Sequence, residues 1–478
     1  MYNTHLVQLV KSLTPEELKE LALFVDSSFF NRSKFRGNMS RLLSLMVEIA
    51  SGEWEFDKKA VFGRLFPGEK ETGGRLEKNM SELSKLIRAF MLTNHYWRPE
   101  NEFYQNLDWA GLLRGRSLNT RYQHTIGQLR ESLGSGAFET TGYCLKQVLF
   151  EKEVLLWESY YNQAKGGLNL PALFHRLEVF YHLNRLEWIN KLLLQQKVAQ
   201  VTISNAADFL FLEISIPVSL LQESASLQIN FQIYQLLKQD VPDVQGFNAL
   251  ADLIKQHEER IESDELQEFY AFLRNLCTLL FNYGHFELLP LLFQLQKDNL
   301  EKGYFYHDGK IPHAAFGSIV SVAIKIEAYA WALQFMEMHK DRIIGGEENN
   351  DLYRLSMANY FFAQKEFEKT LDWIPAAPQN TMFLYRARRL KLKAYYETHS
   401  DLLFYELDAF KMLISRASQK LISPQFRELH ANFVNYLYQI AKSIPGDKAR
   451  LRTLAQRISA KTAIAEKDWL LEKLEGMG

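Results

Sequence analysis

The sequence has very little cysteine, with two residues among 478. Cys144 and Cys277 lie far apart, each among apolar residues, so they supply neither a disulfide framework nor a Cys-x-x-Cys metal motif. This spacing excludes the small secreted scaffolds that depend on disulfides and the zinc modules held by paired cysteines. We predict that both cysteines are small core residues of a protein in a reducing compartment.

Long apolar runs and an excess of one charge are missing as well. The longest apolar runs, such as 276–281 and 319–324, are far shorter than the ~20 residues that cross a bilayer. The N-terminal residues do not form a basic region followed by an apolar one, so we predict no signal peptide. The formal net charge of -1 excludes a protein-wide field that attracts nucleic acid or a membrane surface. We therefore expect a cytoplasmic protein without a membrane partner.

Catalytic signatures are also absent from the sequence. No His-Glu-x-x-His, Cys-x-x-Cys or Gly-x-Ser-x-Gly pattern occurs. We predict a protein that is not an enzyme and has no catalytic residues, no cofactor and no metal. One alternative rests on a predicted loop over 298–313, where His307, Asp308 and His313 are three potential metal ligands.

The residues that are present favour helices along the whole chain. A hydrophobic content of 47% and a charged content of 24% are typical of a folded protein. The segment Thr14–Glu17 supplies an N-cap, a proline at the first helical position and a capping-box glutamate. Further helices are predicted over 39–50, 58–65, 76–95 and 424–441. Convincing period-two alternation is missing, so we predict an all-α protein with almost no sheet.

The clearest internal unit is Asp351–Pro378, which predicts two short helices joined by a tight turn. Ala358 and Thr370 are small residues that let the two helices approach closely. Aromatic residues flank the turn, and two prolines end the second helix. Small residues at the reference position recur at intervals, at Cys277, Ala323, Ala358 and Ala394.

This unit resembles the tetratricopeptide-repeat family, whose period is about 34 residues. The family's small, aromatic, leucine and large apolar positions are matched by Ala358, Phe361, Phe367, Thr370, Leu371, Ile374 and Ala377. The resemblance covers roughly residues 266–410 and departs at Lys365, where the family prefers glycine, and at Leu289 and Glu406. Residues 13–31 and 468–474 also resemble an uncharacterised bacterial group of helical-repeat proteins, a resemblance that implies no activity.

The resemblance implies a right-handed α-α superhelix whose concave groove binds peptides or partner proteins. We predict an N-terminal helical unit over 1–100, a helical bridge over 101–136, and a solenoid over 137–478. The last helices cap the stack, with Trp469 facing inward. The flexible joint before the solenoid is predicted at Gly134–Gly136. Some family members grip a partner's C-terminal carboxylate from the first helices of the hairpins, and Arg354 and Asn359 lie on such a helix.

A strongly basic helix is predicted next, with five positive charges and no acid: Arg386, Arg388, Arg389, Lys391 and Lys393. A second basic stretch, 112–130, carries Arg114, Arg116, Arg121 and Arg130 with interleaved Tyr122 and His124. Three interpretations stay open: these cations pair with acids of the next hairpin, bind an acidic protein, or contact nucleic acid. The leading hypothesis is a scaffold or adaptor for a protein or peptide partner, and the alternative is a nucleic-acid-binding α-solenoid that uses the basic helix.

Overall fold

A computed structural model describes residues 5–70, 73–134, 140–161, 170–199, 214–344, 348–378, 380–418 and 422–477. The chain divides into two compact units, Met1–Asn184 and Arg185–Gly478, which are described separately. This boundary differs from the predicted ones at 100 and 136, and the predicted three-part division stays a prediction. Of the predicted joint at Gly134–Gly136, Gly134 ends a helix, and residues 135 and 136 lie outside the described residues.

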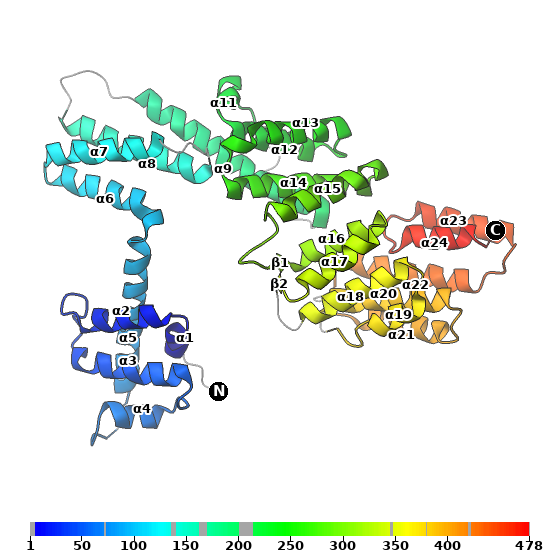
Figure 1. The fold of residues 1–478 in the computed structure, drawn as a ribbon, viewed down its shortest axis with the longest axis horizontal. Helices are drawn as coiled ribbons and strands as arrows, with labels where there is room; N and C mark the ends of the chain where they lie inside the picture. The colour runs from blue at the N-terminus through cyan, green and yellow to red at the C-terminus, as the bar shows by residue number, and fades with distance from the viewer. Residues whose placement is uncertain are drawn as a thin grey trace. The chain divides into compact units, whose positions relative to one another are not determined.

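The first unit is built from helices alone in its described part (Figure 1). Its helices are α1 (His5–Lys11), α2 (Pro15–Asp26), α3 (Arg36–Ser51), α4 (Lys58–Leu65), α5 (Arg75–Tyr96), α6 (Glu102–Gly115), α7 (Asn119–Gly134) and α8 (Thr141–Tyr161). Helix α9 (Leu170–Ala199) crosses the boundary to the second unit. Helices α1 to α5 share one apolar core, in which Leu21, Met39 and Ile87 are completely buried.

The capping pattern predicted for the first long helix is confirmed. Thr14 accepts a hydrogen bond from the backbone N–H of Glu17, and the Glu17 carboxylate accepts one from the backbone N–H of Thr14. Two aromatic residues, Phe29 and Phe30, follow α2, and Phe29 is 67% exposed although its apolar side chain favours burial. Phe30 stacks on Phe24 with ring centroids 4.1 Å apart and remains 45% exposed.

The second unit continues as a succession of helices of moderate length (Figure 1). They are α11 (Val218–Glu223), α12 (Ala225–Lys238), α13 (Val244–His257), α14 (Ser263–Asn282), α15 (Leu289–Glu301), α16 (His313–Lys325), α17 (Tyr329–His339), α18 (Glu348–Ala363), α19 (Phe367–Trp373), α20 (Thr381–Glu397), α21 (Leu403–Arg416), α22 (Pro424–Ala441), α23 (Lys448–Ala460) and α24 (Lys467–Glu475). Sequence neighbours pack together, and α16, α18 and α20 also pack in turn against one another. The all-α prediction is therefore confirmed.

Four consecutive hairpins of this unit share one turn geometry. In each, the residue two positions after the last residue of the first helix has the left-handed conformation: Gly284 (φ 105°), Glu327 (φ 61°), Lys365 (φ 63°) and His399 (φ 50°). At Lys365, the N–H of Glu366 reaches back to the carbonyl of Phe361 and the N–H of Lys365 to that of Phe362, which satisfies two free carbonyls of the helix end. This conformation explains why glycine suits the position, since only glycine adopts it without steric cost.

Two very short strands connect the ends of the α16/α17 hairpin. Strand β1 (Ile311–Pro312) pairs in parallel with β2 (Ile343–Ile344), and the N–H of Ile311 donates to the carbonyl of Arg342 over 2.7 Å. The predicted loop over 298–313 is wrong at both ends: α15 continues to Glu301 and α16 begins at His313. The apolar pattern of 289–300 extends α15, which shortens the connection.

The C-terminal helices α22 to α24 bury a common core with α20 and α21. Ser423 caps α22 by accepting from the N–H of Phe426, so the predicted start and end of this helix are confirmed. Trp469 on α24 faces inward, as predicted, and its indole N–H donates to Glu397 over 2.9 Å. Among the described helices, none is both long and apolar enough to span a bilayer.

Candidate functional site

Helix α20 carries most of the predicted site residues, and its local sequence explains its position. Asn380 caps the helix by accepting from the N–H groups of Met382 and Phe383. The helix is buried on two opposite faces in the second unit. Phe383, Ala387, Leu390 and Ala394 form one face, and Tyr385 and Leu392 form the other. The charged side chains lie between these faces, so they are held at the edge of the core.

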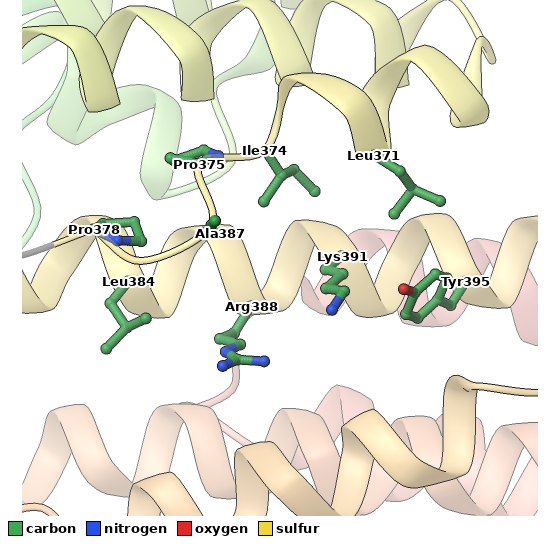
Figure 2. Close-up of a pocket in the computed structure, with 10 residues that line it drawn as sticks. Leu371, Ile374, Pro375, Pro378, Leu384, Ala387, Arg388, Lys391 and Tyr395 are labelled. Atoms are coloured by element: carbon green, nitrogen blue, oxygen red, sulfur yellow. The ribbon is translucent and has the colours of Figure 1, made fainter.

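A recess of about 240 Å³ lies between α19 and α20 (Figure 2). Apolar side chains from both helices and from the proline-rich connection form most of its wall, and the cations Arg388 and Lys391 stand on the α20 side. Its lining residues are Leu371, Ile374, Pro375, Ala376, Pro378, Leu384, Ala387, Arg388, Lys391 and Tyr395. This lining contains no acidic side chain, so the charged border formed by Arg388 and Lys391 is positive.

The two cations of the recess share one carboxylate. Arg388 Nη1 donates to Glu406 Oε2 over 2.8 Å, and Lys391 Nζ donates to Glu406 Oε1 over 2.7 Å. Glu406 lies on α21, where its side chain is largely buried. The arrangement therefore fixes both cations while leaving one net positive charge at the recess.

The other pair of cations on α20 meets a second carboxylate. Lys393 Nζ lies 2.8 Å from Glu466 Oε2, and Arg389 Nε lies 3.3 Å from Glu466 Oε1. Burial would raise the pKa of the Glu466 carboxyl, but Lys393 and Arg389 outweigh it and lower that pKa below its ordinary value. Burial, helped by Arg389, lowers the pKa of His430 to about 3, so this histidine is neutral when it accepts from Arg389 over 3.4 Å. Glu466 thus joins α20 to the start of α24.

The remaining predicted residues lie outside these two clusters. Arg386 is exposed on α20. Arg354 on α18 donates to the carbonyl of Asp372 over 2.9 Å and lies over the Trp373 ring, so it stabilises the end of α19. Asn359 is exposed and donates to the Leu355 carbonyl of its own helix. Arg354 and Asn359 do not line the recess, and their predicted partner-binding role stays a prediction.

Sequence reasoning missed Glu406 and Glu466 as the partners of the basic helix. Glu406 stands at a position where the repeat family prefers a small residue, which was a usable signal. An acidic side chain at a packed position requires a facing cation, because an unpaired buried charge is costly. Glu466 gave no such signal, since it precedes a short helix in which an acidic cap is ordinary.

The chain matches no protein-family model, no curated protein and no solved structure.

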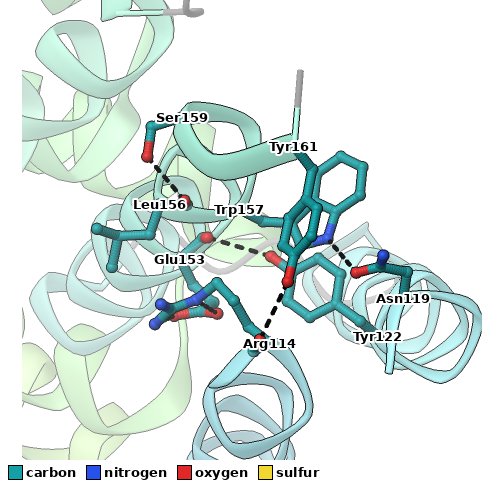
Figure 3. Close-up of polar contacts among 8 residues, drawn as sticks. All are labelled: Arg114, Asn119, Tyr122, Glu153, Leu156, Trp157, Ser159 and Tyr161. Atoms are coloured by element: carbon teal, nitrogen blue, oxygen red, sulfur yellow. Dashed lines mark hydrogen bonds and ion pairs between the residues drawn. The ribbon is translucent and has the colours of Figure 1, made fainter. Parts of the chain in front are cut away.

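The second basic stretch is tied to α8 in the first unit (Figure 3). Arg114 makes two hydrogen bonds with the Glu153 carboxylate, at 2.8 and 3.1 Å, and this pairing raises the pKa of Arg114. The Tyr122 hydroxyl donates to the Glu153 carbonyl over 3.1 Å, and the rings of Tyr122, Trp157 and Tyr161 stack in sequence. These contacts join α6, α7 and α8 into one packed unit.

A shallow polar recess of about 400 Å³ lies between α6 and α7 in the same unit. Trp109, Arg121 and His124 line it and are exposed.

Burial lowers the pKa of His339 in the second unit, where Tyr306 contacts it over 2.9 Å. Among the described residues, no three His, Cys, Asp or Glu side chains lie close enough together to hold a metal ion. The potential ligands His307, Asp308 and His313 are among the residues described, and they do not form such a group.

Proposed function

We propose that this chain is a scaffold or adaptor that binds a protein or peptide partner on its helical-hairpin surface. The observation that carries the proposal is the recess between α19 and α20. Its volume of about 240 Å³ is below the ~300–1,000 Å³ of typical small-molecule sites. A space of this size and apolar lining suits one or two side chains of a longer ligand.

The arrangement of the second unit supports the same proposal. Hairpins α14/α15, α16/α17, α18/α19 and α20/α21 follow one another, each with the same left-handed turn between its helices. A single hairpin cannot bury its apolar face alone, so neighbouring hairpins stack on one another. We propose that this stacking forms a right-handed superhelix with a continuous binding surface.

Affinity capture with the full-length chain tests this proposal. Tagged wild-type protein is incubated with native cell extract, with and without nuclease, beside the variant Ala376→Trp. Ala376 is exposed and lines the recess, so an indole there narrows the opening. The matched control is Ala377→Trp, which alters an exposed neighbour outside the lining. We expect a stoichiometric protein partner that survives nuclease, and its complete absence would refute the proposal.

The nucleic-acid alternative has less support at α20. Arg388, Lys391, Arg389 and Lys393 contact two carboxylates, Glu406 and Glu466. Phosphate contacts would have to compete with these ion pairs. Proteins that are retained without nuclease and lost with it would favour this alternative.

A further inference from the structure

We propose that the recess between α19 and α20 binds a peptide segment in which a bulky apolar residue stands next to an aspartate or glutamate. This inference rests on the proposed function and adds the chemistry of the ligand. It joins two observations: an apolar cavity sized for a side chain, and a positive border that a second carboxylate would complete.

The apolar half of the site follows from the lining. Leu371 and Ile374 extend from α19 toward α20, and Pro375 and Pro378 hold the connection between the helices in place (Figure 2). Both prolines are buried, so the wall of the recess is fixed by the local backbone. Burial of an apolar ligand side chain releases water from these surfaces, which drives binding.

The acidic half of the site follows from the charge balance at the border. Two cations, Arg388 and Lys391, face one carboxylate, Glu406, which leaves a net charge of +1. Their side chains are 35% and 28% exposed, whereas that of Glu406 is only 12% exposed. A guanidinium carries five N–H donors, so Arg388 can keep its bond to Glu406 and hold a second carboxylate.

The same balance argues against a polyanion as the ligand. A nucleic acid brings one charge with every phosphate and gains affinity from many separate cations. Here Glu406 lies between the two cations and repels a dense row of phosphates. A single carboxylate beside an apolar group fits the site better.

A subtractive peptide selection tests the proposal. A randomised library of ten-residue peptides is displayed on phage, selected on full-length wild-type protein and depleted on the folded Ala376→Trp variant. We expect the enriched peptides to share a Leu, Ile, Met, Phe or Trp next to Asp or Glu. Enriched peptides without an acid at this place, or no peptide that distinguishes the two proteins, would overturn the inference.

Binding of one enriched synthetic peptide is then measured by fluorescence anisotropy. Replacing its acid by the neutral amide weakens binding at least fivefold, which corresponds to about 1 kcal/mol. The triple variant Arg388→Gln, Lys391→Gln, Glu406→Gln removes the charged border without leaving an unpaired buried acid, and it loses this discrimination. The control Arg386→Gln removes an exposed cation outside the recess and changes the net charge of the chain by the same amount. This control still binds the acidic peptide more tightly than its amide.

Failure of this inference and failure of the proposed function give different results. A partner that wild-type protein and Ala376→Trp capture equally well places binding elsewhere on the chain, which overturns the inference and leaves the scaffold proposal standing. A partner that Ala376→Trp loses and Ala377→Trp keeps supports both. A partner whose recess-dependent binding survives neutralisation of every acid in its bound segment overturns the inference alone.

Discussion

Glu466 is the residue whose replacement gives the sharpest test of how the C-terminal helices are held. The change Glu466→Gln keeps the shape of the side chain and leaves Lys393 and Arg389 without their counter-charge. Removing one partner of a buried ion pair costs about 3–5 kcal/mol. The Glu466 side chain is 26% exposed, so water screens part of the loss. We therefore expect the free energy of unfolding to fall by about 2 kcal/mol.

The matched control is Glu428→Gln, the same substitution in an exposed pair. Glu428 lies 3.9 Å from Lys461, and both side chains are about half exposed. Such a pair contributes about 0–1 kcal/mol. Urea unfolding of both variants, followed by far-ultraviolet circular dichroism and tryptophan fluorescence, measures the difference. Equal losses in the two variants would refute the electrostatic argument.

The pH dependence of the same variant provides a second check with a defined sign. The folded-state pKa of Glu466 is lowered below the ordinary value of 4.5, so its ionised form stabilises the fold. This contribution is fully present above pH 4.5 and is lost as the pH falls through the folded pKa. Wild type and Glu466→Gln should therefore differ at pH 7 and converge in acid. A difference that persists below the folded pKa would assign the effect to packing instead of charge.

Three further predictions follow from single residues. Lys365→Gly should raise the free energy of unfolding by about 0.5–1 kcal/mol, because glycine adopts the left-handed conformation of this position without strain. The control Lys369→Gly lies inside α19 and should lower the free energy of unfolding by about 1 kcal/mol. Urea titration of both variants measures the two changes, and changes of the same sign would contradict the prediction. Glu153→Gln should lower the free energy of unfolding by about 2 kcal/mol, because Arg114 loses its bidentate carboxylate partner. Differential scanning calorimetry measures this loss, and an unchanged melting transition would disprove the prediction. Burial raises the pKa of Glu265 to about 7, so the stabilising contribution of its protonated form is present below pH 4.5 and is lost as pH rises through 7. The stability of Glu265→Gln relative to wild type should therefore increase between pH 5 and 8. Melting temperatures measured across this pH range test the prediction, and parallel curves of melting temperature against pH for the two proteins would contradict it.

The helices could be predicted from sequence where their signals are local. The start of α22 at Ser423 and Pro424, and the capping box at Thr14, depend on residues within one turn of the helix end. The exposure of Phe29 could not be predicted in this way. Its apolar side chain favours burial, but whether a neighbouring surface covers it depends on tertiary packing.

The candidate site was predictable in its cations and not in its geometry. The charges on α20 are visible in the sequence, whereas Glu466 lies 73 residues beyond Lys393 and meets it only after three further helices have packed. The recess could not be predicted either, because it forms where α19, α20 and the proline-rich connection between them meet in the folded chain. Ion pairing and cavities both depend on distant contacts, which periodicity does not encode.

The pairing of β1 with β2 has a consequence for the motions of the α16/α17 hairpin. In polymer terms it closes this hairpin into a ring, with the left-handed turn at Glu327 at one end and the strand pair at the other. A ring cannot fray from its ends as an open hairpin does, since its termini are already joined. The amide of Ile311 should therefore exchange its hydrogen when the strand pair opens, so the protection of this one proton reports how often the ring is broken.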